Sequence, residues 1–142
     1  MTTTTRIEQN QQYMKQLPEP VISFIQATNS FDTDGFVATF GDDALVNDAQ
    51  REFWGLDAIR RWASREMIGD EVTMLVTDVK EHHGTIIVNA QVDGEFNKTN
   101  LPDPLLLTFY FTVEQDKIVQ LIILLNPPAN EPAIPALTAA ER

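Results

Sequence analysis

The chain has 142 residues, a length typical of one domain, and 43% of them are hydrophobic, which is enough for a complete core. Ten Lys and Arg against 21 Asp and Glu give a formal net charge of −11. This charge argues against partners bound through phosphate contacts, such as nucleic acids, and against an anionic membrane surface. The absence of cysteine excludes a disulfide scaffold, a cysteine zinc site and a thiol nucleophile.

The two ends of the chain differ from its middle in composition. Residues 1–17 are polar, rich in Thr and Gln, and have apolar residues spaced for one short amphipathic helix. They lack the apolar stretch of a secretory signal, so we expect a cytoplasmic protein. Residues 127–142 hold four prolines among Ala and Asn, a composition typical of an extended arm. We therefore expect a single domain over residues 1–142, with its core at 19–126.

Helices are predicted first and strands second along this core. Apolar residues at helical spacing predict a helix over 21–28 after Pro18, a short helix capped by Asp34 and ended by Gly41, and a third helix over 56–67 closed by Gly69. Strands are expected at 44–48, 51–54, 72–80, 85–96, 105–113 and 118–125. Three helices followed by a long antiparallel meander indicate an α+β fold in which the sheet curls around the helices.

Two segments carry a family resemblance. FDTDGFVATFGDDALVND at 31–48 and WGLDAIRRW at 54–62 are similar to the nuclear transport factor 2-like superfamily, and more narrowly to its SnoaL-like polyketide cyclase and ketosteroid isomerase branch. The resemblance covers about residues 19–126. It implies a cone-shaped barrel in which a curled antiparallel sheet wraps three N-terminal helices around a deep apolar pocket. It also implies a homodimer formed through the outer face of the sheet.

The same resemblance places Asp48 where ketosteroid isomerases carry their general base, and Trp62 where an aromatic ring lines the pocket. Two further positions depart from that enzyme: Phe24 replaces the tyrosine, and Leu107 the protonated acid, that stabilise the enolate oxygen. Loss of one such donor costs about a hundredfold in rate, so classical ketosteroid isomerisation is not expected.

The catalytic residues of two other enzyme classes in this superfamily match this chain no better. Epoxide hydrolases of this fold carry two acids bridged by an arginine on inner strand positions, but residues 105–111 contain neither Arg nor Asp. Polyketide cyclases place an acid on a late strand, where this chain has Gln120. The resemblance therefore implies a pocket with one candidate acid and an incomplete catalytic set.

The candidate site consists of Asp48 as the catalytic acid and a set of pocket-lining side chains: Phe24, Trp54, Trp62, Leu107, Phe109, Leu121 and Ile123. Asp48 also has a purely structural interpretation, as a carboxylate paired with Arg51, and either tryptophan could be a core residue instead. His82 and His83 are adjacent in an apparent turn, where solvent exposure is usual and two neighbours cannot easily share one metal. We predict neither a metal nor a cofactor.

Two hypotheses of different classes follow. The first is an isomerase, cyclase or dehydratase that moves a proton on a small apolar, carbonyl-bearing molecule, with Asp48 as the base. The second is a non-catalytic module that keeps the pocket or the dimer face without chemistry. The absence of a buried hydrogen-bond donor near a ligand held beside Asp48 would favour the second.

Overall fold

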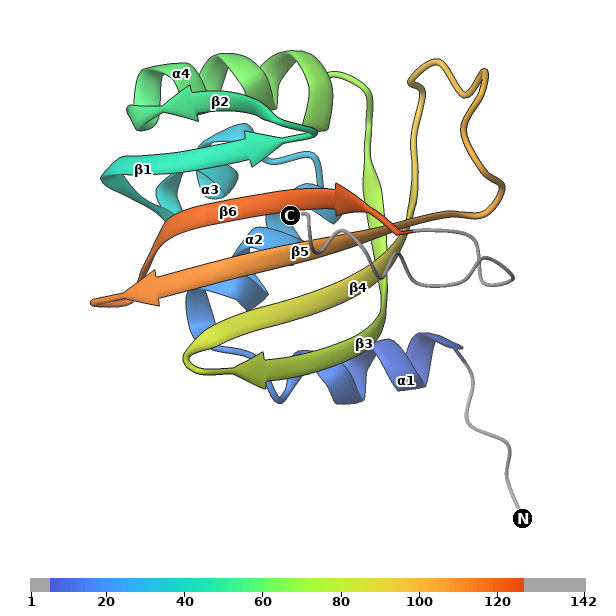
Figure 1. Cartoon of the computed structure of the whole chain (residues 1–142), viewed down its shortest axis with the longest axis horizontal. Helices are drawn as coiled ribbons and strands as arrows, with labels where there is room; N and C mark the ends of the chain where they lie inside the picture. Colours follow the sequence, from blue (N-terminus) through green and yellow to red (C-terminus); the bar gives the residue numbers. More distant parts are fainter. Residues whose placement is uncertain (1–5, 127–142) are drawn as a thin grey trace, which may run out of the picture.

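The computed structural model describes residues 6–126. Its helices are α1 (Arg6–Met14), α2 (Glu19–Asn29), α3 (Thr33–Ala38) and α4 (Gly55–Trp62), and α4 continues into the π-helix η1 (Ala63–Met67). Its strands are β1 (Phe40–Asp48), β2 (Arg51–Trp54), β3 (Thr73–His82), β4 (Thr85–Asp93), β5 (Leu105–Glu114) and β6 (Lys117–Leu125) (Figure 1). The α+β class is confirmed. Within residues 6–126, no helix has both the length and the apolar character needed to cross a membrane.

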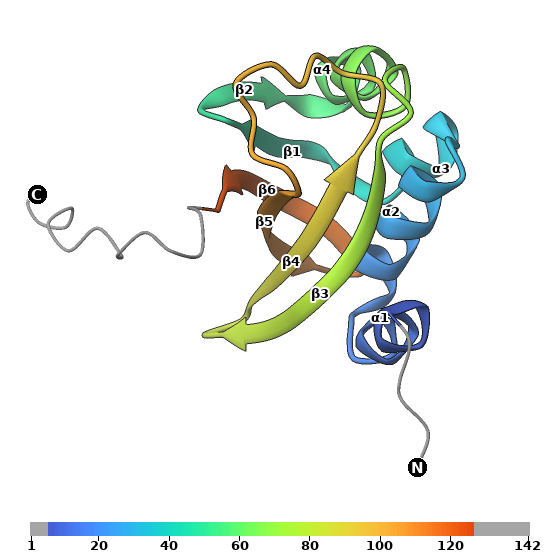
Figure 2. The same ribbon diagram turned by 90° about the vertical axis from the view of Figure 1, so that its right-hand side faces the viewer.

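The six strands form one sheet in the order β2-β1-β6-β5-β4-β3. The sheet curls without closing, and α2 and α3 lie against its concave face (Figure 2). One pairing differs from the predicted antiparallel sheet, because β1 runs parallel to β6. The chain between these two strands passes through β2, α4 and three further strands, and this long connection makes the parallel pairing possible.

Local sequence explains the start of the first helices. Pro20 lies in the first turn of α2, where a missing backbone N–H costs nothing. The cap of α3 is Asp32 rather than the predicted Asp34, since the Asp32 carboxylate accepts a hydrogen bond from the Gly35 backbone N–H at 3.0 Å. Asp34 instead accepts a hydrogen bond from the Arg60 guanidinium of α4 at 2.8 Å.

The predicted helix over 56–67 changes its winding part-way along. After Trp62 the chain forms a π-turn, in which the backbone N–H of Ile68 donates to the carbonyl of Ala63 at 2.7 Å. Gly69 follows this turn as predicted. A Cβ atom there would lie 2.3 Å from the carbonyl oxygen of Ser64, so only glycine fits without a backbone shift.

The part of the core under α2 and α3, which we call the closed half, consists largely of aromatic side chains. Phe24 of α2 is fully buried, and its ring centroid lies 4.7 Å from that of Phe36 and 5.2 Å from that of Phe111. Phe40 and Trp62 extend the cluster through contacts with Phe36. These rings anchor α2 and α3 to the inner face of the sheet.

Helix α1 is the short amphipathic helix expected within residues 1–17, but it is not an appendage, because it packs along the free edge of β3 (Figure 2). Asn10 accepts a hydrogen bond from the backbone N–H of Val76 at 2.7 Å. Asn29 of α2 both donates to and accepts from the backbone of Met74. These two asparagine side chains thus occupy backbone N–H and C=O groups at the edge of β3 that could otherwise pair with another strand.

Candidate functional site

The inner face of the sheet is hollow where η1 and loop 94–104 cover it. A pocket of about 320 Å³ opens there, and we call it the Asp48 pocket. Its walls are mostly apolar side chains of the sheet, η1 and the chain around them, including Met67, Val92, Leu107, Phe109 and Ile123. The charged residues that line it are Asp48, Arg51, Glu66 and Asp70. Apolar walls with a few convergent polar groups are typical of small-molecule sites.

The β1–β2 hairpin places Asp48 at this pocket. Asp48 is the last residue of β1, and the two-residue connection Ala49–Gln50 has positive φ at both positions, as a tight hairpin turn requires. The backbone N–H of Gln50 donates to the side chain of Asn47 at 2.9 Å, which holds the turn. In the sheet register, Asp48 lies opposite Arg51 on one side and Ile123 on the other.

One carboxylate oxygen of Asp48 is fixed and the other is not. Oδ2 accepts hydrogen bonds from Nε1 of Trp62 and from the Arg51 guanidinium, each at 3.0 Å. Within the described residues, Oδ1 accepts none. The side chain of Asp48 is 23% exposed and lines the pocket, and its second oxygen has no protein donor among the described residues.

Arg51 joins Asp48 to a second acid. Its two terminal nitrogens donate to the two carboxylate oxygens of Glu66 at 2.9 and 2.7 Å, a bidentate pair. The hydrogen bond to Glu66, together with the charges of Glu66 and Asp48, raises the pKa of Arg51 above its ordinary value. Glu66 belongs to η1, so the π-turn gives this acid its position. The guanidinium also lies 5.6 Å from the ring centroid of Phe53, which stacks on Trp62.

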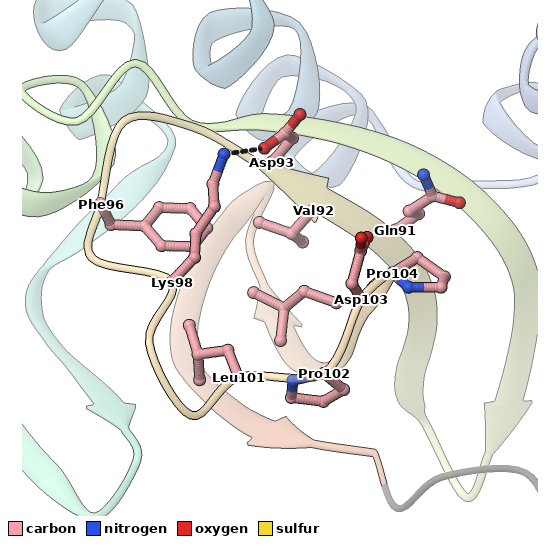
Figure 3. A pocket seen from close by; sticks show the side chains of 10 residues that line it. Gln91, Val92, Asp93, Phe96, Lys98, Leu101, Pro102, Asp103 and Pro104 are labelled. Carbon is pink, nitrogen blue, oxygen red and sulfur yellow. Dashed lines mark ion pairs between the residues drawn. The ribbon is translucent and has the colours of Figure 1, made fainter.

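Loop 94–104, between β4 and β5, closes one side of the pocket. Figure 3 shows Phe96 and Leu101 of this loop pointing toward Val92 of β4. These three side chains line both the Asp48 pocket and a neighbouring hollow of about 490 Å³. The Lys98 ammonium pairs with Asp93 at 2.8 Å and lies over the Phe96 ring (Figure 3). The neighbouring hollow is larger, but Asp48 does not line it, so we take the smaller pocket as the candidate site.

Residues 21–121 match the family described as the SnoaL-like domain. The chain belongs to this family. Among solved structures, a candidate polyketide cyclase from Sinorhizobium meliloti is 28% identical, with a TM-score of 0.70, over 78% of this chain and 98% of that one. This result confirms the resemblance to the SnoaL-like branch.

More distant structures share the fold of this SnoaL-like chain. A candidate ketosteroid isomerase from Kribbella flavida has a TM-score of 0.65 at 14% identity, over 87% of this chain and 86% of that one. A Mycobacterium tuberculosis protein, solved in complex with estradiol-17β-hemisuccinate, has a TM-score of 0.62 at 13% identity, over 75% of this chain and 91% of that one. No curated protein matches this chain.

The structure separates the eight predicted site residues of this SnoaL-like chain into three groups. The Asp48 pocket is lined by four of them: Asp48, Leu107, Phe109 and Ile123. Three others are core residues that do not line it: Phe24, Trp62 and Leu121. Trp62 still contacts the site through its hydrogen bond to Asp48.

Trp54, predicted in the pocket wall, does not line the Asp48 pocket. Trp54 lies opposite Leu45 in the β1–β2 register, while the neighbours of Leu45 on β1, Ala44 and Val46, are fully buried. Side chains alternate between the faces of a strand, so Leu45 and Trp54 lie on the outer face, where Trp54 is 64% exposed. The predicted pairing of Asp48 with Arg51, by contrast, is confirmed.

Sequence reasoning missed Glu66, Asp70 and the aromatic ring of Phe96. Glu66 lies within the π-turn and Asp70 follows it, and no periodicity in the sequence marks where an α-helix changes to a π-helix. Phe96 was assigned to a strand, whereas β4 ends at Asp93 and Phe96 lies in loop 94–104. Pro102 and Pro104 indicate a loop before β5, but nothing in the sequence indicates that the loop lies over a pocket.

The lining of the Asp48 pocket also limits its chemistry. No hydroxyl, amide or imidazole side chain is among the described residues that line it, and its one guanidinium is already bonded to Asp48 and Glu66. Within residues 6–126, no group of three or more His, Asp or Glu is arranged to hold a metal ion. His82 and His83 are exposed in the β3–β4 turn, away from the pocket.

Proposed function

We propose that this SnoaL-like chain binds a small hydrophobic molecule in the Asp48 pocket, with Asp48 as its polar anchor. One observation carries the proposal: an apolar cavity of about 320 Å³ holds a carboxylate with one oxygen fixed by Trp62 and Arg51 and the other unoccupied. A fixed acceptor in an apolar cavity orients a ligand without an added cost of ordering the side chain. The steroid derivative bound by the Mycobacterium tuberculosis protein shows that this fold can hold such a molecule.

The pocket favours binding over carbonyl chemistry. Proton removal beside a carbonyl develops negative charge on the carbonyl oxygen, and that charge needs a donor already in place. The donors used by ketosteroid isomerases are replaced by Phe24 and Leu107, and the lining side chains supply no substitute. We therefore infer that the non-catalytic alternative describes this chain better than an isomerase does.

Titration calorimetry with 2-naphthalenemethanol, a compact apolar alcohol whose hydroxyl can donate to Oδ1 of Asp48, tests the binding. We expect one molecule to bind per chain, and Leu107→Trp to abolish the heat because the indole fills the cavity. Leu56→Trp is the matched control, since Leu56 packs at the edge of the core and does not line the pocket. Binding that survives Leu107→Trp, or no binding to the wild-type chain, would refute the proposal.

A second candidate function, proton transfer by Asp48, rests on the unoccupied Oδ1, which could accept a proton from a ligand carbon. Exchange of the α-hydrogens of 2-tetralone in D₂O, followed by NMR, measures this directly. Our proposal expects exchange no faster with the protein than with buffer. Acceleration that Asp48→Asn abolishes would instead establish catalysis and overturn the non-catalytic assignment.

We propose further that two copies of the chain associate through the outer face of the sheet. Between residues 106 and 112 of β5 and between residues 120 and 124 of β6, the outward side chains carry no charge: Leu106, Thr108, Tyr110, Thr112, Gln120, Ile122 and Leu124. Two copies that each have a net charge of −11 repel one another least where such a face meets its own copy. Leu124, 41% exposed, and Trp54 provide apolar surface for the contact.

Sedimentation velocity tests the association. The wild-type chain should sediment as a dimer, and Ile122→Glu as a folded monomer, because a carboxylate in the centre of the face would be buried unpaired. Ser64→Glu, an equal charge change at an exposed position on η1, should leave the dimer intact. A monomeric wild-type chain would refute this assignment.

A further inference from the structure

The Asp48 pocket is negatively charged as well as apolar. Three carboxylates line it, those of Asp48, Glu66 and Asp70, against the single guanidinium of Arg51. Asp48, whose side chain is 23% exposed, lies beside hydrocarbon walls, where solvent screens its charge less than on the open surface, whereas Arg51 and Glu66 are 50% and 37% exposed. The binding site is the cavity itself, and the charge of these acids determines which class of ligand binds in it.

Arg51 is not available to an anionic ligand. Its terminal nitrogens donate to Glu66 and Asp48, and its Nε donates to the backbone carbonyl of Asp48 at 3.3 Å. A carboxylate that entered the pocket would have to break these charge-assisted bonds, or remain unpaired beside three like charges. Both costs disfavour acids as ligands.

A cationic ligand, in contrast, would find carboxylate acceptors in the pocket that have no donor in the described part of the chain. Oδ1 of Asp48 accepts no hydrogen bond within the described residues, and the carboxylate of Asp70 forms no ion pair there. An ammonium group supplies the N–H donors that both groups lack, and it gains Coulomb energy from all three acids.

The aromatic walls also suit a cation. Phe96 and Phe109 both line the cavity, and the face of an aromatic ring attracts a positive charge. The chain already uses this attraction at the pocket boundary, where Nζ of Lys98 lies 5.7 Å from the ring centroid of Phe96. An apolar body in the cavity and an ammonium group near Asp48 would therefore both be accommodated.

We propose that the Asp48 pocket selects apolar molecules that carry a positively charged amine over their neutral and acidic counterparts. This inference rests on the proposed function, since it names the class of ligand for the same pocket. It goes beyond that function because apolar walls alone would favour the neutral molecule over both charged ones, since a charged group is costly to remove from water.

Three ligands with one apolar body test the inference: 2-naphthylmethylamine, 2-naphthalenemethanol and 2-naphthoic acid. We expect the amine to bind at least tenfold more tightly than the alcohol in calorimetry at low salt, and the acid to bind more weakly than both. The preference should fall as salt is added. Asp48→Asn should reduce amine affinity about tenfold and change alcohol affinity little.

Asp57→Asn is the matched control for the general attraction of a cation to an acidic chain. Asp57 is exposed on α4 and does not line the pocket, so its substitution should leave the amine preference unchanged. Equal losses in the two Asn variants, or equal affinity of the wild type for amine and alcohol, would overturn the charge selection while leaving the apolar binding in place. Failure of all three ligands to bind would refute the proposed function as well.

Discussion

The inner face of β5 is sealed at one end and open at the other. Phe111 is fully buried against Phe24, with ring centroids 5.2 Å apart. Leu107, four residues earlier on the same face, is only partly buried and lines the Asp48 pocket. The difference lies in what covers the strand: helices α2 and α3 over Phe111, and loop 94–104 with η1 beside Leu107.

This contrast shows how one apolar strand can serve both core and site. A helix brings large side chains at regular spacing and fills the space above a sheet, as Phe24 and Phe36 do here. A loop and a π-turn contribute fewer inward side chains, so a cavity remains. The pocket is therefore a consequence of coverage and does not require a special sequence on β5.

The largest effect is expected from truncating a large side chain to alanine. The truncation should lower the free energy of unfolding much more in the half of the core under α2 and α3 than in the half beside the Asp48 pocket. Phe24→Ala would remove a ring that contacts Phe36, Phe40, Phe109 and Phe111, leaving a closed cavity and lowering the free energy of unfolding by about 4 kcal/mol. Leu107→Ala only widens an existing pocket and should cost roughly 1 kcal/mol. Urea unfolding of both variants measures the difference, and equal losses would mean that the open half is packed as tightly as the closed one.

The free energy of unfolding should be nearly as sensitive to a substitution at the π-turn, which shapes the open half of the core beside the Asp48 pocket. The Cβ of Gly69→Ala would lie 2.3 Å from the carbonyl oxygen of Ser64 and 2.6 Å from that of Arg65, so the backbone must shift, at a cost of about 3 kcal/mol. The shift should also separate Glu66 from Arg51. Gly41→Ala, whose added Cβ meets only ordinary contacts at 3.8 Å, should stay within about 0.5 kcal/mol of wild type in the same unfolding assay. If the two alanines behave alike, the tight turn is absent in solution.

Most of the closed half could be predicted from the sequence. Apolar residues at helical spacing identify α2, and strict alternation identifies β4, because one face of each must be buried. The pairing of Asp48 with Arg51 was also accessible, since a two-residue hairpin turn fixes which residues lie opposite each other.

The open half was harder to predict because its geometry depends on long-range packing. The parallel pairing of β1 with β6 joins strands that are far apart in sequence, and nothing local signals it. The bridge from Arg51 to Glu66 needs both the hairpin and the π-turn in place. The outward position of Trp54 is not evident from the sequence, because a short strand carries too few residues to show which face is buried.

Asp48→Asn tests whether the acid of the open half stabilises the fold. We expect the free energy of unfolding to fall by about 1 kcal/mol at neutral pH, because Oδ2 accepts charge-assisted and indole hydrogen bonds that an amide replaces poorly. Asp57→Asn should change it little. A more stable Asn variant would mean that Asp48 is held at a cost to stability, as catalytic groups commonly are, and would strengthen the proton-transfer candidate.

The smallest effect is expected at loop 94–104, where the exposed pair of Asp93 and Lys98 borders the open half. The hydrogen bond from Lys98, aided by the backbone N–H of Gly94, lowers the pKa of Asp93 below its ordinary value. A carboxylate with a lowered pKa contributes its full stability above its unfolded-state pKa, so the contribution begins to fall below about pH 4 and is gone once the pH is below the lowered, folded-state pKa. Lys98→Met should raise the pKa of Asp93 in an NMR titration, whereas Lys80→Met, at a longer pair with Asp78, should not move it. Because solvent and salt screen such a pair, neither substitution should change the midpoint of thermal unfolding. An unchanged pKa in Lys98→Met would show that the loop is not held to β4 by this pair, and that Phe96 is kept over the pocket by packing alone.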